Sequence, residues 1–541
     1  MTQAALTHPS AAQATADPDP APAPRGLLRW AADRSGWLGP IGVALFAGLL
    51  RFWNLGHPNA FVFDETYYPK DAWSLLQQGY EGTWPDHANA DILAVPQSVP
   101  LSSAPEFIAH PPLGKWVMAV GEQLFGLHPF GWRFMTALLG TLAVLMLARI
   151  GRRLFGSTLV GCTAALLMSV DGLQLVMSRV GLLDGIQMFF VLASFGALLI
   201  DRDHARARLA AAAGAGVDGD TVRLGLRPWR IAAGVLIGAA GAVKWNGAPI
   251  LAAFGILTVL WDQSGRRGAG ARHPWRSMLR RDAVPAFLAM VGSAVVVYVG
   301  AWSGWLANGA NSGGYDRHWA DGRAGLSPDH AFGVPLPQVS MSWVPAPLRS
   351  LWHYHSQMYD FNTGLSTPHT YQSNPYAWLV DGRPVSMYWE QVPAGTHGCT
   401  SSGGCASQIL GLGTPFLWWA ACFALVYLLW RWFFRRDWRS GAVLCAVAGI
   451  YLPWFQYQER TIFSFYMVVL VPFLCLAVAQ MLGAILGPAG CSPVRRRYGA
   501  VGAGLIVLAV VGCFAFFYPL YTAEVIPMSS WQDRMWFTSW I

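Results

Sequence analysis

The sequence predicts an all-α, polytopic membrane protein. Of its 541 residues, 54% are hydrophobic and 12% are charged, whereas a soluble domain carries roughly 25% charged residues. Apolar runs of about 20 residues, the length that crosses a bilayer as a helix, recur along the chain. Arginine-rich or aromatic segments separate these runs. One membrane-embedded helical domain is therefore expected to use most of the chain.

About eleven transmembrane helices are expected. The segment 231–261 overshoots one crossing, and Lys244-Trp245-Asn246-Gly247 interrupts it, so it is expected to form two short spans that meet at the outer surface. The other spans are expected at roughly 37–52, 131–150, 157–176, 183–200, 284–302, 411–430, 441–456, 462–486 and 499–521.

The two ends of the chain are expected to lie outside this domain, which is placed at 37–522. Residues 1–24 are rich in Ala and Pro and lack the apolar region of a cleavable signal. Residues 1–36 are therefore expected to form a disordered cytoplasmic tail. The Trp-rich segment 523–541 is expected to be an extracytoplasmic tail that anchors at the membrane interface.

The distribution of basic residues predicts the orientation. With the N-terminus inside and the spans alternating, 25 of the 37 Lys and Arg residues fall in inner segments, as the positive-inside rule requires. The net charge of +8 then reflects membrane topology, and a nucleic-acid partner is not expected. Two long loops, about 53–130 and 303–410, lie outside the membrane. Long loops beside a scaffold usually carry function.

Two of the eight cysteines fall in the second outer loop. Cys399 and Cys405 lie close together among Gly and Ser residues. An oxidising outer compartment permits a disulfide between them. A structural zinc site would need four ligands and is not favoured.

Charged side chains gather near the outer membrane face. The acidic pair Asp64-Glu65 follows the first span, and carboxylates so close to lipid are usually exposed to water or functional. Lys115, Arg133, Arg179, Asp184, Lys244, Glu459 and Arg460 come from other segments on this face.

Each of these charges has a local alternative. Arg179 with Asp184 and Arg460 with Glu459 would be simple ion pairs, and Lys244 would extend to the interface alone. Together, however, several cations beside two carboxylates suggest a site for an anionic group with a base next to it. A phosphate whose tail stays in lipid fits this site. The expected reaction is transfer of a group from a lipid-linked phosphate to a hydroxyl.

Six segments, in order over about residues 40–520, resemble motifs of protein O-mannosyltransferases. They are Phe63-Asp64-Glu65-Thr66-Tyr67-Tyr68-Pro69-Lys70, His110-Pro111-Pro112-Leu113-Gly114-Lys115, Ser178-Arg179-Val180-Gly181-Leu182-Leu183-Asp184, Lys244-Trp245-Asn246-Gly247, the stretch 369–378, and Arg460-Thr461-Ile462-Phe463-Ser464-Phe465-Tyr466. The stretch 369–378 carries the pattern His-x-Tyr-x-Ser-x-Pro-x-x-Trp.

The resemblance implies a GT-C type glycosyltransferase fold and a reaction. Members of the family transfer mannose from a polyprenyl- or dolichyl-phosphate to Ser or Thr of a translocating protein and invert the anomeric centre. By this resemblance Asp64 is the base, and Glu65 shapes the acceptor site. Lys115, Lys244 and Arg460 would hold the donor phosphate, supported by Arg133 and Arg179. The resemblance implies no metal and no cofactor.

The groove for sugar and acceptor is the least defined part of this prediction. His110, Asp184, His353, His369 and Tyr371 are its candidate residues. Aromatic faces suit the C–H surfaces of sugars. The outer-loop aromatics and histidines, Trp389 included, would equally serve to anchor the loop at the membrane interface.

One departure from the pattern narrows the resemblance. Eukaryotic members carry a β-trefoil module in the central outer loop, whereas the loop 303–410 continues directly into the family's Trp, His and Tyr elements. The chain is therefore more similar to actinobacterial members, whose donor is polyprenyl-phosphate mannose. The expected partners are this donor, Ser/Thr-rich secretory proteins and the bilayer of the plasma membrane, and the secretion translocon is a candidate partner.

Two alternatives stay open. A GT-C enzyme acting on a glycolipid or a cell-wall glycan would share the fold and the phosphate site. A secondary transporter would share the broken 231–261 segment, but transporter sites lie near the membrane midplane, whereas these charges cluster at one face.

Overall fold

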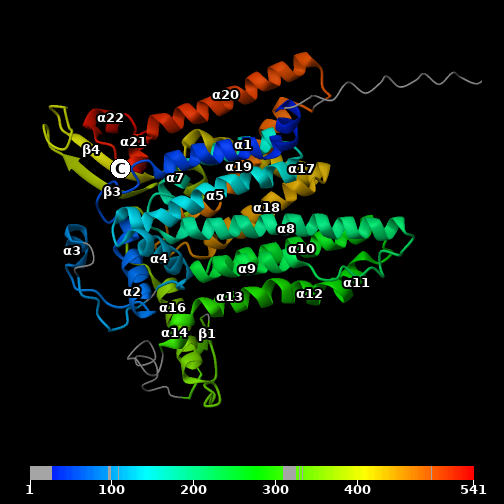
Figure 1. Ribbon diagram of the computed structural model, residues 1–541, viewed down its shortest axis with the longest axis horizontal. Coiled ribbons are helices and arrows are strands. Elements are labelled where there is room, and N and C mark those ends of the chain that lie inside the picture. The colour runs from blue at the N-terminus through cyan, green and yellow to red at the C-terminus, as the bar shows by residue number, and fades with distance from the viewer. Residues whose placement is uncertain are drawn as a thin grey trace, which may run out of the picture.

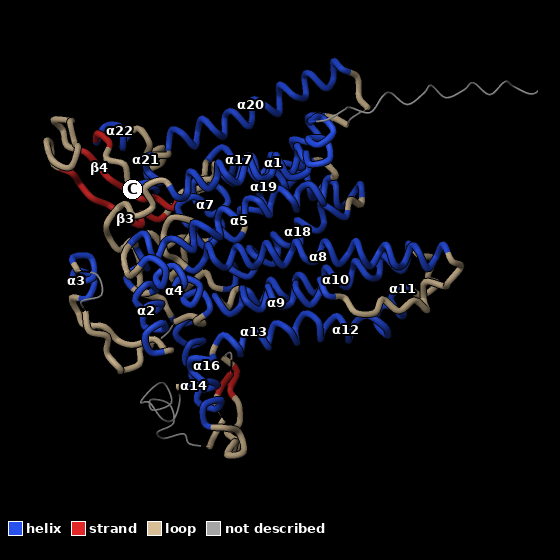
Figure 2. Tube along the Cα trace, viewed as in Figure 1, coloured by secondary structure: helices blue, strands red, loops and turns tan. Residues whose placement is uncertain are grey.

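The computed structural model describes residues 27–95, 99–107, 109–308, 325–327, 329–331, 333–488 and 490–541. Its long helices run side by side, and short helices, loops and strands cover one end of the bundle (Figures 1 and 2). We call this covered end, on the left in Figure 1, the cap end. Within these ranges, five helical stretches are long and apolar enough to cross a membrane, namely Pro129–Phe155, Leu183–Gly214, Pro274–Ala301, Pro415–Arg435 and Pro493–Phe517.

Each predicted span contains a helix in the described part of the chain. These helices are α1 (Leu27–Phe52), α5 (Pro129–Phe155), α6 (Thr158–Ser169), α8 (Leu183–Gly214), α9 (Pro228–Val243), α10 (Gly247–Gly268), α13 (Ser293–Ala301), α17 (Pro415–Arg435), α18 (Trp438–Tyr451), α19 (Val471–Leu486) and α20 (Pro493–Phe517). The short α7 (Gly172–Met177) follows α6. A run of α11 (Pro274–Met278), a π-helical turn (Leu279–Ala283), α12 (Val284–Phe287) and a second π-helical turn (Leu288–Gly292) leads into α13.

The break inside 231–261 lies where the sequence predicted it. Helix α9 ends at Val243 and α10 begins at Gly247, so Lys244 lies in a turn between two helices. A side chain at Gly247 would bring its Cβ within 2.7 Å of the backbone nitrogen of Gly241. The turn can close in this way because Gly247 lacks a side chain.

Helix α19 forms the centre of the bundle and is shorter than predicted. Its residues from Val471 to Gln480 are all buried, and it packs against α6, α17 and α20. A helix that is apolar on every side is expected at such a position. Residues 464–469, predicted to begin this span, form a 3-10 helix at the cap end instead.

The two long loops build most of the cap end. The first loop contains a 3-10 turn (Phe63–Thr66) and the helices α2 (Tyr68–Gln78), α3 (Ala88–Ala94) and α4 (Leu113–Phe125). The second contains α14 (Ser303–Ala307), the two-residue strands β1 (His330–Ala331) and β2 (Val334–Pro335), and α16 (Ala346–Gly364). These elements lie beside the helix ends rather than along the bundle (Figure 1).

A three-stranded sheet departs from the all-α expectation. Strands β3 (Val385–Val392) and β4 (Cys405–Gly411) form an antiparallel hairpin, and β5 (Ile526–Pro527) pairs with the other edge of β4. A disulfide joins Cys399 to Cys405 with 5.7 Å between their Cα atoms. It closes the hairpin loop where Cys405 pairs with Val392.

Helices lie within both segments that were expected to be tails. Residues 1–26 lie outside the described residues, but α1 begins at Leu27, inside the segment expected to be disordered. The C-terminal segment, with α21 (Pro519–Thr522) and α22 (Met528–Gln532), packs on the protein. Trp540 is 1% exposed and donates a 2.7 Å hydrogen bond to the carbonyl of Asp381. This ring therefore docks in the protein instead of anchoring at the membrane interface.

Candidate active site

The acidic pair lies on the 3-10 turn that begins the cap end. Phe63 has a φ of +51°, a conformation uncommon for a residue with a side chain. The amides of Glu65 and Tyr67 donate to the carbonyls of Val62 and Asp64, both at 3.0 Å. The tight turn gives the two neighbouring carboxylates different surroundings.

Glu65 is completely buried and fully hydrogen-bonded. Its Oε1 accepts from Arg133 Nε at 2.8 Å and from the Gly181 amide at 2.7 Å, and its Oε2 accepts from Arg133 and from the Val62 amide, both at 2.8 Å. Arg133 also donates to three carbonyls of residues 55–60. The Glu65–Arg133 pair fastens the acidic turn to α5 and to the start of α8, so Glu65 serves to position this turn. All N–H donors of Arg133 are used, and none is free to bind a phosphate.

Asp64 is only partly buried and faces a mixed set of charges. Burial raises its pKa to about 6, the charge of Lys244 lowers it, the charge of Asp184 raises it, and a hydrogen bond with Tyr68 lowers it. A carboxylate with a pKa near the working pH is well suited to take a proton from a hydroxyl. Among the two carboxylates of the pair, Asp64 is therefore the one with the properties of a base.

Lys244 and Asp184 form an ion pair beside Asp64. Lys244 Nζ lies 2.7 Å from Asp184 Oδ2, and the second oxygen of Asp184 is buried without a hydrogen-bond partner in the part of the chain that the structure describes. The Lys244 ammonium also lies 5.1 Å from the centre of the Tyr466 ring, within the range of a cation–π contact. The alternative pair of Arg179 with Asp184 does not form.

Arg179 lies at the end of α1 instead. It donates hydrogen bonds of 2.7–3.2 Å to the carbonyls of residues 50, 51, 53 and 54. A cationic side chain that binds the last carbonyls of a helix stabilises that helix end. Arg179 therefore positions the chain segment that leads from α1 to Asp64.

Arg460 retains unused hydrogen-bonding capacity. One of its terminal nitrogens donates to Asn362 Oδ1 at 3.3 Å, while its Nε is buried and has no hydrogen-bond partner among the described residues. Glu459 is exposed, and the structure has no Arg460–Glu459 ion pair. Asn362 in turn donates to the Ala109 carbonyl at 2.9 Å. The half-buried Arg460 side chain is thus held beside the His110 segment with donors to spare.

His110 stands among the cations of the site. Burial, followed by the charges of Lys244, Lys115 and Arg460, holds the pKa of His110 well below its ordinary value. The imidazole is therefore neutral at pH 7, with one N–H donor and one acceptor nitrogen.

Lys115 is committed to carboxylates of the first loop. Its ammonium is 1% exposed and lies 2.8 Å from Asp71 and 3.3 Å from Glu81. Both acids hold the pKa of Lys115 above its ordinary value, against the opposing effect of burial. Lys115 thus has two carboxylate partners, whereas Lys244 has one ion-pair partner among the described residues.

Among the predicted groove residues, His369 reaches the acidic turn and His353 does not. The ring of His369 lies 6.3 Å from Phe63 and 5.0 Å from Phe463, and its Nδ1 accepts from the Tyr371 amide at 3.1 Å. His353 instead lies on α16, where its Nε2 is 2.8 Å from the Leu326 carbonyl.

Trp389, considered for the same groove, packs on Trp531 of the C-terminal segment, with 4.9 Å between ring centres. Neither Trp389 nor His353 contacts Asp64 in the described part of the chain. Among the described residues, no three His, Cys, Asp or Glu side chains gather in a way that could hold a metal ion.

Comparison with known proteins decides the family. Residues 42–281 match the family of dolichyl-phosphate-mannose-protein mannosyltransferases, and residues 347–540 match the C-terminal four-helix membrane region of protein O-mannosyltransferases. A polyprenol-phosphate-mannose–protein mannosyltransferase of Mycobacterium tuberculosis is 35% identical over 93% of this chain and 92% of its own. Relatives of the same description from Mycolicibacterium smegmatis and Corynebacterium glutamicum are 36% and 32% identical over at least 92% of each chain.

The chain belongs to the protein O-mannosyltransferase family. It is accordingly a polytopic membrane protein and a glycosyltransferase, as the sequence predicted. Solved structures agree on the fold. A yeast protein O-mannosyltransferase complex bound to its sugar donor (S. cerevisiae) has a TM-score of 0.70 at 14% identity, over 94% of this chain and 93% of its own. An oligosaccharyltransferase from Archaeoglobus fulgidus has a TM-score of 0.50 at 14% identity, over 94% of this chain and 58% of its own.

Three residues of the candidate site were not among the predicted site residues. Tyr68 and Tyr466 lie inside the quoted motifs, so their place beside the acidic pair and the late arginine was the available signal. Asn362 has no such signal. It reaches Arg460 only because α16 ends beside two segments that lie far from it in the sequence.

Proposed function

We propose that this protein transfers a mannosyl group from polyprenyl-phosphate mannose to Ser or Thr hydroxyls of secreted or membrane proteins. Family membership supports the reaction class, and the relatives' descriptions support the donor and the protein acceptor. The observation that carries the proposal is Asp64, a recessed carboxylate with a pKa of about 6 beside Lys244 and Tyr68. This group is placed to activate a hydroxyl next to cations that suit a phosphate.

The chemical step balances with protein groups alone. Asp64 takes the proton of the acceptor hydroxyl, and the oxygen attacks C1 of mannose on the face opposite the phosphate. The bond between C1 and the phosphate oxygen breaks, so polyprenyl phosphate leaves with the electron pair and the anomeric centre is inverted. No cofactor takes part in this proposal, because the leaving group departs as an anion that nearby cations stabilise.

We assign the phosphate to Arg460 and Lys244. Arg460 has a buried Nε without a partner, and a guanidinium binds phosphate oxygens as a planar fork. Lys244 adds a compact charge that is already beside Asp64. Lys115, Arg133 and Arg179 act by positioning, since each is bound to carboxylates or backbone carbonyls of the cap end. Glu65 positions the turn that carries Asp64.

His110, His369 and Tyr371 are proposed to line the sugar and acceptor groove. His369 lies against Phe63, next to the base. The Tyr371 ring has the guanidinium of Arg383 5.5 Å from its centre. His353 is not part of this groove in our proposal, because it is bound to a different segment of the second loop.

The cap end is proposed to face the outside of the plasma membrane. The arginine-rich segments 202–230 and 266–281 lie at the other end of the bundle, and inner segments of membrane proteins carry this excess. An outward-facing site meets polypeptides as they leave the membrane, and delivery by the secretion translocon is the route we propose for the acceptor.

The test uses the full-length protein in liposomes with radiolabelled polyprenyl-phosphate mannose and a Ser/Thr-rich peptide. Asp64→Asn should fold normally and lose peptide labelling, whereas Asp91→Asn, an exposed carboxylate in the same loop, should keep it. Full activity of Asp64→Asn would refute the assignment of the base. Label that enters a glycolipid but never the peptide would refute the protein acceptor.

A further inference from the structure

A cavity of about 720 Å³ lies at the end of the bundle opposite to Asp64. Its walls come from the loop before α9, the start of α9 and both π-helical turns of the helical run 274–301. Five arginines line it, Arg223, Arg227, Arg230, Arg280 and Arg281. None of these arginines takes part in the proposed mannosyl transfer, so their positive charge must serve a different purpose.

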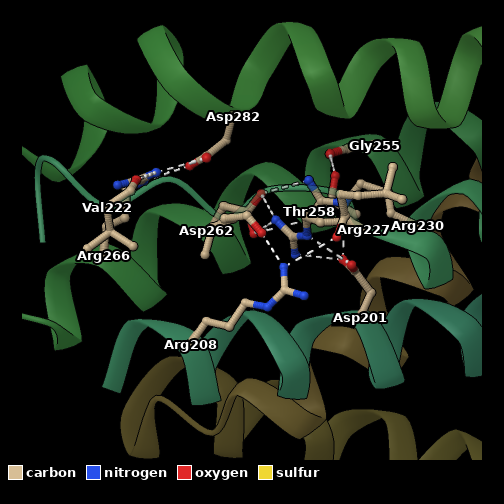
Figure 3. Close-up of polar contacts among 12 residues, drawn as sticks. Asp201, Arg208, Val222, Arg227, Arg230, Gly255, Thr258, Asp262, Arg266 and Asp282 are labelled. Atoms are coloured by element: carbon tan, nitrogen blue, oxygen red, sulfur yellow. Dashed lines mark hydrogen bonds and ion pairs between the residues drawn. The ribbon is translucent and has the colours of Figure 1, made fainter. Parts of the chain in front are cut away.

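Two of the five arginines are already neutralised. Arg227 and Arg230 each bind both Asp201 and Asp262, with separations of 2.6–3.1 Å (Figure 3). The four side chains tie α8, α9 and α10 together. They hold the wall of the cavity in place and leave little positive charge of their own.

The acidic residue of the cavity is neutralised as well. Asp282 forms two hydrogen bonds of 2.6 and 2.9 Å with Arg266 (Figure 3). Arg223, Arg280 and Arg281 consequently line the cavity without an ion-pair partner in the described part of the chain. Three guanidinium groups around one space favour a ligand with negative charge, and phosphate suits them by charge and by geometry.

The remaining wall is mainly apolar and belongs to a helical run whose outer side chains are exposed. Ile231, Pro285 and Leu288 line the cavity beside the arginines. Val284, Phe287 and Leu288 on the same helical run are 61–67% exposed, as expected for side chains in contact with lipid tails. A ligand that fills this cavity can therefore place a charged group among the arginines and a hydrocarbon chain along the helix.

The backbone at this place is also unusual. The helix forms π-helical turns at Leu279–Ala283 and Leu288–Gly292, and residues of both turns line the cavity. π-helical turns are rare in proteins, but those that occur are frequently found at functional sites. Here they bring Arg280, Arg281 and Leu288 to one side of the helix.

The cavity is too far from Asp64 to hold the donor during the transfer. Helix α9 contains 16 residues and runs from the cavity to Lys244. At a rise of 1.5 Å per residue this helix is about 24 Å long. A phosphate in the cavity and a phosphate at Lys244 would thus lie near opposite surfaces of the membrane.

We propose that this cavity binds the phosphate headgroup of an anionic membrane lipid in the leaflet opposite to Asp64. Arg280 and Arg281 hold the phosphate from the helix and Arg223 from the loop, while an acyl chain lies against Ile231 and Leu288. Basic pockets between membrane helices are known to bind such headgroups. The proposal does not depend on the reaction at Asp64.

Native mass spectrometry of the full-length protein in detergent provides the test, with phosphatidylglycerol and phosphatidylcholine as probes. The wild type should bind phosphatidylglycerol more tightly than phosphatidylcholine. Arg280→Ala/Arg281→Ala should weaken that binding about 30-fold, since each arginine near an anionic lipid contributes about 1 kcal/mol. Arg272→Ala/Arg276→Ala removes the same charge from exposed positions outside the cavity and should weaken binding about threefold at most.

A second variant leaves the charge unchanged. Ala289→Trp places a large ring in the cavity and should weaken phosphatidylglycerol binding as strongly as the arginine variant. If the arginine variant fails to fold, the Ala289→Trp variant alone tests whether the lipid binds in the cavity. Peptide mannosylation by both variants should stay at the wild-type level and serves as the control for folding.

Three results would overturn the proposal. Equal loss of binding in the two arginine pairs would mean diffuse attraction rather than a site. Equal binding of phosphatidylglycerol and phosphatidylcholine by the wild type would mean that the headgroup charge is not recognised. Inorganic phosphate or glycerol phosphate that binds as tightly as the lipid, with the same dependence on Arg280 and Arg281, would mean that the ligand is a soluble phosphate.

Discussion

Lys244 and Asp184 form a 2.7 Å ion pair at the meeting point of α9, α10 and α8, directly beside Asp64. The lysine is 8% exposed and the aspartate 1%. Their charges act on Asp64 in opposite directions, because Lys244 lowers its pKa and Asp184 raises it. The pair therefore adjusts the pKa of the proposed base, which burial raises, and holds a cation for the donor.

Asp184→Asn should move the acidic limb of the pH–rate profile to lower pH. A general base works when it is deprotonated, so activity is present above its pKa and is lost as the pH falls through it. In the wild type this loss is expected near pH 6, the pKa of Asp64. Loss of the Asp184 charge lowers that pKa, and kcat/KM for the peptide measured from pH 4.5 to 8, a range of about two units around this value, should show the shift.

Lys244→Met should shift the acidic limb of the pH–rate profile in the opposite direction. It removes the charge that lowers the pKa of Asp64, so the acidic limb should move to higher pH. Asp91→Asn, exposed in the first loop, should leave the limb in place. Shifts of both variants in the same direction would contradict the electrostatic account.

Arg460→Ala should impair use of the donor rather than of the peptide. Loss of a charge-assisted contact to phosphate costs about 2–3 kcal/mol, so kcat/KM for polyprenyl-phosphate mannose should fall roughly 30- to 150-fold. Arg460→Lys keeps the charge but not the planar fork and should fall between wild type and alanine. Steady-state kinetics with each substrate varied in turn separates the two effects.

Arg497→Ala is the matched control for this prediction, because Arg497 is exposed at the start of α20, at the opposite end of the bundle. Its donor kinetics should equal those of the wild type. If Arg460→Ala raised only the KM for the peptide, the guanidinium would belong to the acceptor site instead.

Hydropathy and motifs predicted much of this molecule for a physical reason. Apolar length and charge spacing are local properties, so the helices, the turn at Lys244 and the gathering of Asp64, Asp184 and Arg460 could be inferred from the sequence. The choice of ion-pair partner is not local. Lys115 binds Asp71 and Glu81, which lie 44 and 34 positions before it, and no pattern in the sequence distinguishes this arrangement from a phosphate ligand.

The sheet was missed for a related reason. Strand β3 is a short mixed segment, Val385–Val392, inside a loop rich in Gly and Pro. Its partner β4 pairs on the other edge with β5 of the C-terminal segment, which is more than 100 positions away. The sequence likewise predicted that Trp540 is a membrane anchor, because its hydrogen bond to the Asp381 carbonyl joins residues far apart in the sequence.

Cys399→Ser/Cys405→Ser should loosen the hairpin without unfolding the bundle. The bond closes a loop with a sequence separation of 6, and a loop this short is stabilised by about 2 kcal/mol. Hydrogen exchange of the amides in 385–411 should therefore become faster, while the melting temperature of the helices stays unchanged. Cys491→Ser, a free cysteine outside the hairpin, should change neither quantity. A large fall in melting temperature would mean that the disulfide holds the cap end to the bundle.

Glu65→Gln should destabilise the protein before it affects chemistry. The substitution leaves the buried guanidinium of Arg133 without its carboxylate, and breaking a buried ion pair in this way costs about 3–5 kcal/mol. The melting temperature in detergent should fall, and mannosyl transfer should fall with it because the turn that carries Asp64 is released. In Glu65→Gln/Arg133→Met the unmatched charge is gone, so the double variant should lose less stability than the two single variants added together. A Glu65→Gln protein that melts like the wild type but transfers no mannose would instead assign Glu65 a direct part in the reaction.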